Sequence, residues 1–100
     1  MTDTEEVKSI LAKQQTYLAS HYGVSKIGLF GSYASGKPSE SSDVDLFIEF
    51  ERPIGFKFIE LADYLEQVLG REVDILTQAG IDGIRIPAVA QDIEETILYV

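Results

Sequence analysis

The stretch Asp43–Glu51, which reads DVDLFIEFE, decides the fold. Its residues alternate in type with a period of two, so an extended chain here has one apolar side and one acidic side. The apolar side carries Val44, Leu46, Ile48 and Phe50, and the other side carries Asp43, Asp45, Phe47, Glu49 and Glu51. Pro53 and Gly55 then end the pattern. The stretch therefore predicts a β-strand with one face in a hydrophobic core and one acidic face.

Two further segments are predicted strands. Lys26–Phe30 (KIGLF) is a short apolar run that follows a glycine, and Glu72–Leu76 (EVDIL) alternates Val73 and Ile75 with acidic residues. Between the first two strands, Lys37–Ser42 (KPSESS) has the composition of a loop.

Apolar residues at helical spacing indicate three helices around these strands. They are residues 4–22, residues 56–69 and a segment that begins at Pro87 and carries Val89, Ile93 and Ile97 on one stripe. Gly23 and Gly70 follow the first two helices and are expected to end them. Gly80–Gly83 is predicted to be a turn.

This order of elements, α-β-(α)-β-α-β-α, predicts an α/β (α+β) fold. Its helices are expected to pack on one face of a small mixed β-sheet. A chain of 100 residues is expected to form one domain, residues 1–100. An alternative is that Ser35–Ser42 links two domains. The two pieces would each be too small to form a hydrophobic core, so we interpret this segment as a loop within one domain.

Composition excludes several classes of function. Eight basic and 17 acidic residues give a net charge of −9, which disfavours direct nucleic-acid binding by repelling phosphate backbones. There is no cysteine and one histidine, His21, so a disulfide, a zinc–thiolate site and a multi-histidine site are excluded. No apolar run is long enough to span a membrane, and the acidic N-terminus is unlike a signal peptide, so the expected location is the cytoplasm.

Asp43 and Asp45 are the first candidate site residues. At positions i and i+2 of a strand both carboxylates leave the same face, about 7 Å apart along the strand. They repel each other unless solvent or a cation neutralises them, and hard oxygen ligands favour Mg²⁺ or Mn²⁺. Asp74 should emerge on the same face if Val73 and Ile75 pack on the helices. The alternative is an ordinary solvated face of a sheet.

Gly31-Ser32 is a candidate phosphate-binding turn. It follows a predicted strand, where exposed backbone N–H groups and a serine hydroxyl can bind phosphate, although a plain turn is the simpler alternative. Gly31–Lys37 is nearly a P-loop, but Pro38 stands where that motif needs a serine or threonine, so the P-loop interpretation is rejected.

Taken together, Gly31-Ser32 after one strand, Asp43-Val44-Asp45 on a second and Asp74 on a third form one pattern. The pattern resembles the nucleotidyltransferase superfamily that includes DNA polymerase beta and kanamycin nucleotidyltransferase, and most closely its minimal (MNT) members. Their signature is GSxAxGxxxxxSDxDL, and the segments 31–36 and 42–46 fit it. The resemblance covers essentially the whole chain. Ser35 departs from it, since many relatives carry a basic residue there, and Lys37 is a candidate substitute.

The resemblance implies a polymerase beta-like fold and a Mg²⁺-dependent transfer of NMP to a hydroxyl, with AMP from ATP favoured over another NTP. Gly31 and Ser32 would bind the β and γ phosphates, and Asp43 and Asp45, with Asp74, would hold two Mg²⁺ ions (or Mn²⁺). Asp74 would orient or deprotonate the acceptor hydroxyl, or act mainly as a metal ligand.

Minimal MNT proteins resemble the antitoxin half of pairs with a HEPN ribonuclease toxin. The resemblance therefore implies a HEPN-type partner and transfer of AMP to one of its tyrosines. Two alternatives stay open: a non-catalytic antitoxin that neutralises its partner by contact, and a nucleotidyltransferase with a small-molecule acceptor. Three converging acids favour catalysis, because a pure binding module would not need them.

Overall fold

The computed structural model describes residues 4–34 and 43–100. The predicted loop at Lys37–Ser42, and Ser35 within the signature, lie outside these residues. In the part of the chain that is described, no helix is long and apolar enough to cross a membrane.

The centre of the fold is a four-stranded sheet in the order β3-β2-β1-β4. The strands are β1 (Val24–Phe30), β2 (Val44–Phe50), β3 (Val73–Leu76) and β4 (Leu98–Tyr99). Strand β1 pairs antiparallel with β2 and β4, whereas β2 and β3 run parallel, so the predicted mixed sheet is confirmed. β1 begins earlier than predicted, and its register shifts between Val24 and Lys26. β4 was not predicted, because two residues are too few to show a period.

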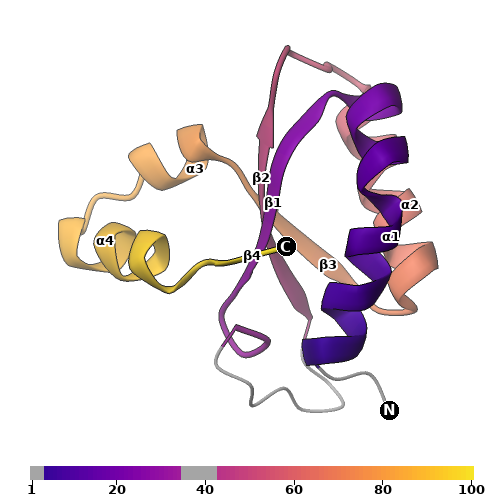
Figure 1. The fold of residues 1–100 in the computed structure, drawn as a ribbon. Helices are drawn as coiled ribbons and strands as arrows, with labels where there is room; N and C mark the ends of the chain where they lie inside the picture. Colours follow the sequence, from indigo (N-terminus) through magenta and orange to yellow (C-terminus); the bar gives the residue numbers. More distant parts are fainter. Residues whose placement is uncertain (1–3, 35–42) are drawn as a thin grey trace.

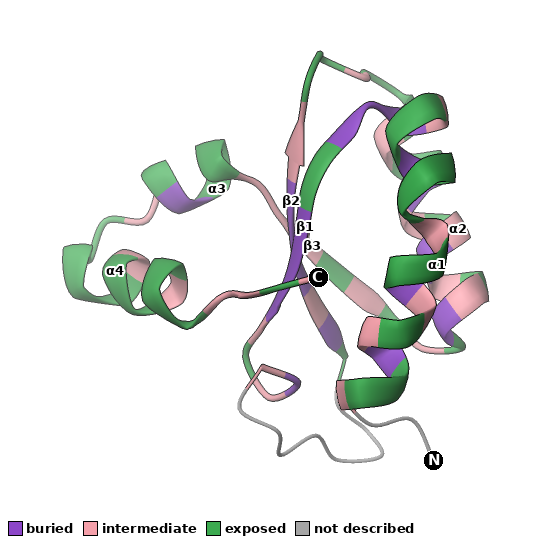
Figure 2. Ribbon diagram, in the orientation of Figure 1, coloured by how far each residue is buried: buried purple, intermediate pink, exposed green. Residues whose placement is uncertain are grey.

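Helices α1 (Thr4–Tyr22) and α2 (Lys57–Leu69) lie together on one side of the sheet (Figure 1). Gly23 ends α1 as predicted, with φ 69° and its N–H donating to the carbonyl of Ala19 at 3.1 Å. Figure 2 shows buried residues on the inner sides of both helices and along the central strands. The core cluster consists of Val7, Leu11, Leu18, Tyr22, Val24, Ile27, Leu29, Tyr33, Val44, Leu46, Ile48, Leu61, Leu65 and Leu69.

The C-terminal helices correct two expectations. Residues 78–82 form helix α3 (Gln78–Asp82) where a turn was predicted, because the side chain of Thr77 caps it by accepting from the N–H of Gly80 at 3.3 Å. Helices α3 and α4 (Pro87–Thr96) also lie on the opposite side of the sheet from α1 and α2, so the helices do not all pack on one face (Figure 1). The second face of the sheet is covered because it is not purely acidic. Phe47 on this face of β2 is buried, and α3 packs against this strand.

Helix α4 begins at Pro87 as predicted, but it ends before Ile97. The backbone of Ile97 is extended, with φ −64° and ψ 126°, so this residue leaves the predicted helical stripe and leads into β4. A Cβ on Gly28 would lie 2.6 Å from Cγ2 of Ile97 and 3.2 Å from the carbonyl oxygen of Leu98. The missing side chain at Gly28 therefore lets the C-terminal segment approach β1 closely.

Candidate active site

Strand register places Asp45 between β1 and β3. Its Cα is paired with that of Phe30 on one side and that of Asp74 on the other. The backbone N–H of Val44 donates to the carbonyl of Glu72 at 2.9 Å, which holds the start of β2 against the segment leading into β3. Directly paired residues of neighbouring strands share a face. The structure therefore brings Asp45 and Asp74 side by side on one face, as the alternation in β3 predicted.

Asp43 stands just before β2, two residues from Asp45 and exposed to solvent, while Asp45 is half-buried and Asp74 is exposed. The pKa of Asp45 is raised, first by burial of its carboxyl group and then by the negative charges of Asp74 and Asp43. All three acids thus share one electrostatic neighbourhood. A positive charge bound there would relieve their repulsion.

The fit of these acids to a metal ion depends on their chemistry more than on a preformed shell. Among residues 4–34 and 43–100, no three or more histidine and acidic side chains form a group that could hold a metal ion. Carboxylate oxygens are nevertheless the donors that Mg²⁺ and Mn²⁺ prefer, and Mg²⁺ is commonly bound by one or two carboxylates together with the phosphates of a substrate. The donor set fits a cation that arrives with a phosphorylated ligand.

Gly31 lies directly against the carboxylate of Asp45. It adopts φ +70°, a left-handed conformation that favours glycine, and a Cβ at this position would collide with Oδ2 of Asp45 and lie 3.3 Å from its Cγ. The predicted phosphate-binding turn and the predicted metal-binding carboxylate are therefore in contact. Ser32, the other residue of this turn, is half-buried.

Tyr33 anchors the turn at residues 31–34 to the core and to α1. Its ring is fully buried in the core cluster, and its carbonyl accepts a hydrogen bond of 2.6 Å from the hydroxyl of Thr4 in α1. The buried hydroxyl of Tyr33 has no hydrogen-bond partner within the described part of the chain. This anchor holds Gly31 and Ser32 at the end of β1, beside Asp45.

A pocket of about 500 Å³ adjoins the turn and includes residues that the sequence did not indicate. It is lined by Phe30, Gly31, Ala34, Asp92, Ile93 and Thr96. The last three come from α4, which sequence alone could not place near Gly31. No local pattern at these positions distinguishes them from the rest of an amphipathic helix.

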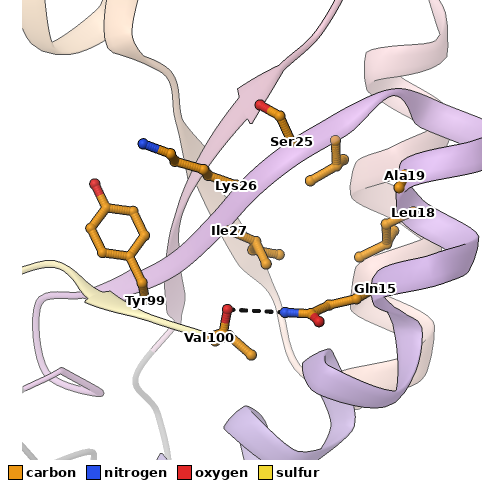
Figure 3. Close-up of a pocket in the computed structure, with 9 residues that line it drawn as sticks. Gln15, Leu18, Ala19, Ser25, Lys26, Ile27, Tyr99 and Val100 are labelled. Carbon is orange, nitrogen blue, oxygen red and sulfur yellow. Dashed lines mark hydrogen bonds between the residues drawn. The ribbon is translucent and has the colours of Figure 1, made fainter.

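Another pocket, of about 390 Å³, lies away from these residues at the edge of β1 (Figure 3). It is lined by Gln15, Leu18, Ala19, Val24, Ser25, Lys26, Ile27, Tyr99 and Val100, and Gln15 donates to the carbonyl of Val100 at 2.9 Å. It contains none of the predicted site residues. The candidate active site is therefore the one beside Gly31.

Transfer of a phosphoryl-type group needs positioning and neutralisation of charge more than covalent chemistry. The predicted phosphate-binding turn contacts Asp45, and two further acids lie near that carboxylate, so the arrangement is consistent with such a transfer. A family model described as "Nucleotidyltransferase domain" matches residues 11–100, so the chain belongs to this family. The resemblance seen in the sequence is confirmed, and the chain is an enzyme of the nucleotidyltransferase class.

Individual relatives have names of the same class, and one solved structure shares the fold. The chain is 39% identical over 101 residues to "Protein adenylyltransferase MntA" of Thermococcus cleftensis, covering 100% of this chain and 98% of that protein. It is 41% identical over 103 residues to "Putative protein adenylyltransferase MJ1379" of Methanocaldococcus jannaschii, with 100% of both chains covered. A solved "Structure of putative minimal nucleotidyltransferase" superposes with a TM-score of 0.70 at 26% identity, covering 97% of this chain and 95% of that one.

Proposed function

We propose that the chain transfers AMP from ATP to a hydroxyl group of a protein, namely a tyrosine of a HEPN-type ribonuclease toxin that it neutralises. The observation that carries the chemistry is the half-buried Asp45, whose carboxylate touches Gly31 and whose pKa is raised by burial and by Asp74 and Asp43. The names of the relatives support a protein acceptor. Residues 1–100 would act as one nucleotidyltransferase domain, which is supported by the one core cluster that the residues described in the structure form.

The proposed reaction transfers AMP in one displacement step at the α-phosphorus of ATP. The acceptor oxygen attacks the α-phosphorus of ATP, the bond from that phosphorus to the bridging oxygen breaks, and pyrophosphate leaves with the electron pair. The proton of the acceptor hydroxyl passes to the carboxylate of Asp74. Gly31 and Ser32 would bind the β and γ phosphates through the backbone and the serine hydroxyl.

Asp43 and Asp45, together with Asp74, would hold Mg²⁺ or Mn²⁺ ions that enter with the nucleotide. When bound, such ions neutralise charge on the phosphates and orient them for in-line displacement. Phosphate oxygens would complete the coordination, in keeping with the lack of a ready three-residue shell among the described acids.

The decisive experiment compares ATP labelled in the α phosphate with ATP labelled in the γ phosphate. The purified chain, incubated with Mg²⁺ and the protein encoded by the neighbouring reading frame, should give a partner labelled by the first nucleotide only. Asp45→Asn should abolish labelling. Glu49→Gln is the matched control, since it removes a carboxylate from the same face of β2, where Glu49 faces Lys26 at 3.7 Å and not the site.

Asp74→Asn separates the two roles considered for this residue. As general base or orienting group, the variant should bind Mg²⁺ and ATP like the wild type but transfer about 10²–10⁴-fold more slowly. A loss of Mg²⁺ affinity alongside the rate would make Asp74 mainly a metal ligand. Neutralisation of the partner by unlabelled wild-type protein, with no nucleotide transferred, would refute the proposal in favour of inhibition by contact.

A further inference from the structure

The pocket between the end of β1 and helix α4 has no role in the chemistry described so far. It is lined by Phe30, Gly31 and Ala34 at the end of β1 and by Asp92, Ile93 and Thr96 of α4. Its volume of about 500 Å³ is in the usual range for small-molecule sites.

This pocket is continuous with the candidate active site. Phe30 is the direct Cα partner of Asp45, and Gly31 touches the carboxylate of Asp45. A ligand in the pocket would therefore adjoin both the proposed phosphate-binding turn and Asp45. A nucleotide whose phosphates occupy the Gly31 turn could place its other end there.

The walls of the pocket favour a neutral group that donates hydrogen bonds. Phe30, Ala34 and Ile93 are apolar, whereas Asp92 contributes a carboxylate that accepts no hydrogen bond from any residue the structure describes. The Thr96 hydroxyl already donates to the carbonyls of Asp92 at 2.8 Å and Ile93 at 3.3 Å, so its oxygen is left as an acceptor. Both polar groups of the wall therefore act as acceptors.

The negative charge of Asp92 decides which part of a nucleoside triphosphate fits. A carboxylate repels a phosphate chain that no cation shields, but it accepts hydrogen bonds from ribose hydroxyls or from an amino group of a base. Apolar walls suit the faces of a base and a sugar. The phosphates are thus directed to the Gly31 turn and the nucleoside to α4.

We infer that this pocket binds the nucleoside end of the nucleotide substrate, with Asp92 as the residue that recognises its hydrogen-bond donors. The inference rests on the proposed function, because it assumes that a nucleoside triphosphate is the substrate. It adds α4 as the element that selects a nucleotide over a bare polyphosphate.

Calorimetric titration with Mg·ATP and with Mg·tripolyphosphate tests this inference, because the second ligand carries the phosphates without a nucleoside. Asp92→Asn should weaken Mg·ATP binding by about 10- to 100-fold, the usual range for a lost hydrogen bond to a charged group. The affinity of Asp92→Asn for Mg·tripolyphosphate should match that of the control variant Glu95→Gln. Asp92→Ala should weaken ATP binding at least as much.

Glu95→Gln is the matched control for charge. Glu95 is exposed on α4, accepts from the Gln91 side chain at 2.9 Å and does not line the pocket. Both variants remove one negative charge from the same helix, so a change common to them reflects the overall field. Thermal melts should show that Asp92→Asn and Glu95→Gln remain folded, because both positions are exposed.

The outcomes separate the two proposals. If the wild type binds and transfers AMP but Asp92→Asn binds ATP like Glu95→Gln, the nucleoside site is refuted and the proposed function stands. Equal losses of ATP and tripolyphosphate affinity in Asp92→Asn would also refute it, because Asp92 would then act on the phosphates. A wild-type chain that binds no Mg·ATP would overturn both.

Discussion

Replacing Gly31 by alanine perturbs the contact on which the candidate site depends. At φ +70° any residue with a Cβ is strained by about 1–2 kcal/mol. The new methyl group would also collide with Oδ2 of Asp45 and force that side chain from its conformation, at a further cost of about 0.5–1.5 kcal/mol. The expected loss in the free energy of unfolding is therefore about 1.5–3.5 kcal/mol.

Gly55→Ala supplies the control for the backbone term. Gly55 has φ +56°, and a Cβ there would meet nothing within 4 Å. Its replacement should cost the backbone strain alone, about 1–2 kcal/mol. The difference between the two variants measures the collision with Asp45, and urea denaturation of both gives it directly.

A double-mutant cycle completes this test. In an Asp45→Ala background the colliding oxygen is absent, so Gly31→Ala should cost no more than Gly55→Ala does. The reasoning fails if Gly31→Ala and Gly55→Ala are equally destabilising in the wild-type background. It also fails if removing the Asp45 side chain leaves the cost of Gly31→Ala unchanged.

Three further predictions concern single side chains. Asp45→Asn should raise the free energy of unfolding at neutral pH, because the pKa of the Asp45 carboxyl is raised in the folded state. Such a carboxyl contributes stability below its unfolded-state pKa and loses that contribution as the pH rises through its folded-state pKa, so the gain should vanish near pH 3, at about which both states are protonated. Urea titrations at both pH values check this, and a less stable variant at neutral pH would contradict it. Tyr33→Phe should leave stability unchanged or raise it by up to about 1–3 kcal/mol, because the hydroxyl removed is buried without a partner among the described residues. Tyr64→Phe, which removes a hydrogen bond to Gln14, should instead cost about 1 kcal/mol in the same denaturation assay.

The position of α4 has a consequence for how this small fold forms a site. The helix buries none of its residues fully, so it adds little to the core, yet it supplies half of the wall beside Gly31. Its attachment runs through Ile97 and β4, which lie close to Gly28. α4 is therefore better understood as an element that shapes the site than as one that stabilises the sheet.

Local pattern in the sequence was sufficient for the central elements of this protein. The alternation over Asp43–Glu51 predicted β2 and its two faces, and Gly23 predicted the end of α1, because each signal depends on neighbours a few residues away. The spacing of Gly31-Ser32 from Asp43 and Asp45 was enough to indicate the family, which the family model then confirmed.

What only the tertiary structure decided is how distant segments meet. The pairing of Asp45 with Asp74 depends on the register of β2 and β3, and the short strand β4 exists only because Leu98 and Tyr99 find β1. The sequence likewise placed the last helix, α4, on the wrong face and predicted a turn in place of α3, since one buried Phe47 on an otherwise acidic face does not indicate a covering helix. Asp92 beside Gly31 followed from that packing, because no local rule relates a residue of the last helix to a turn after the first strand.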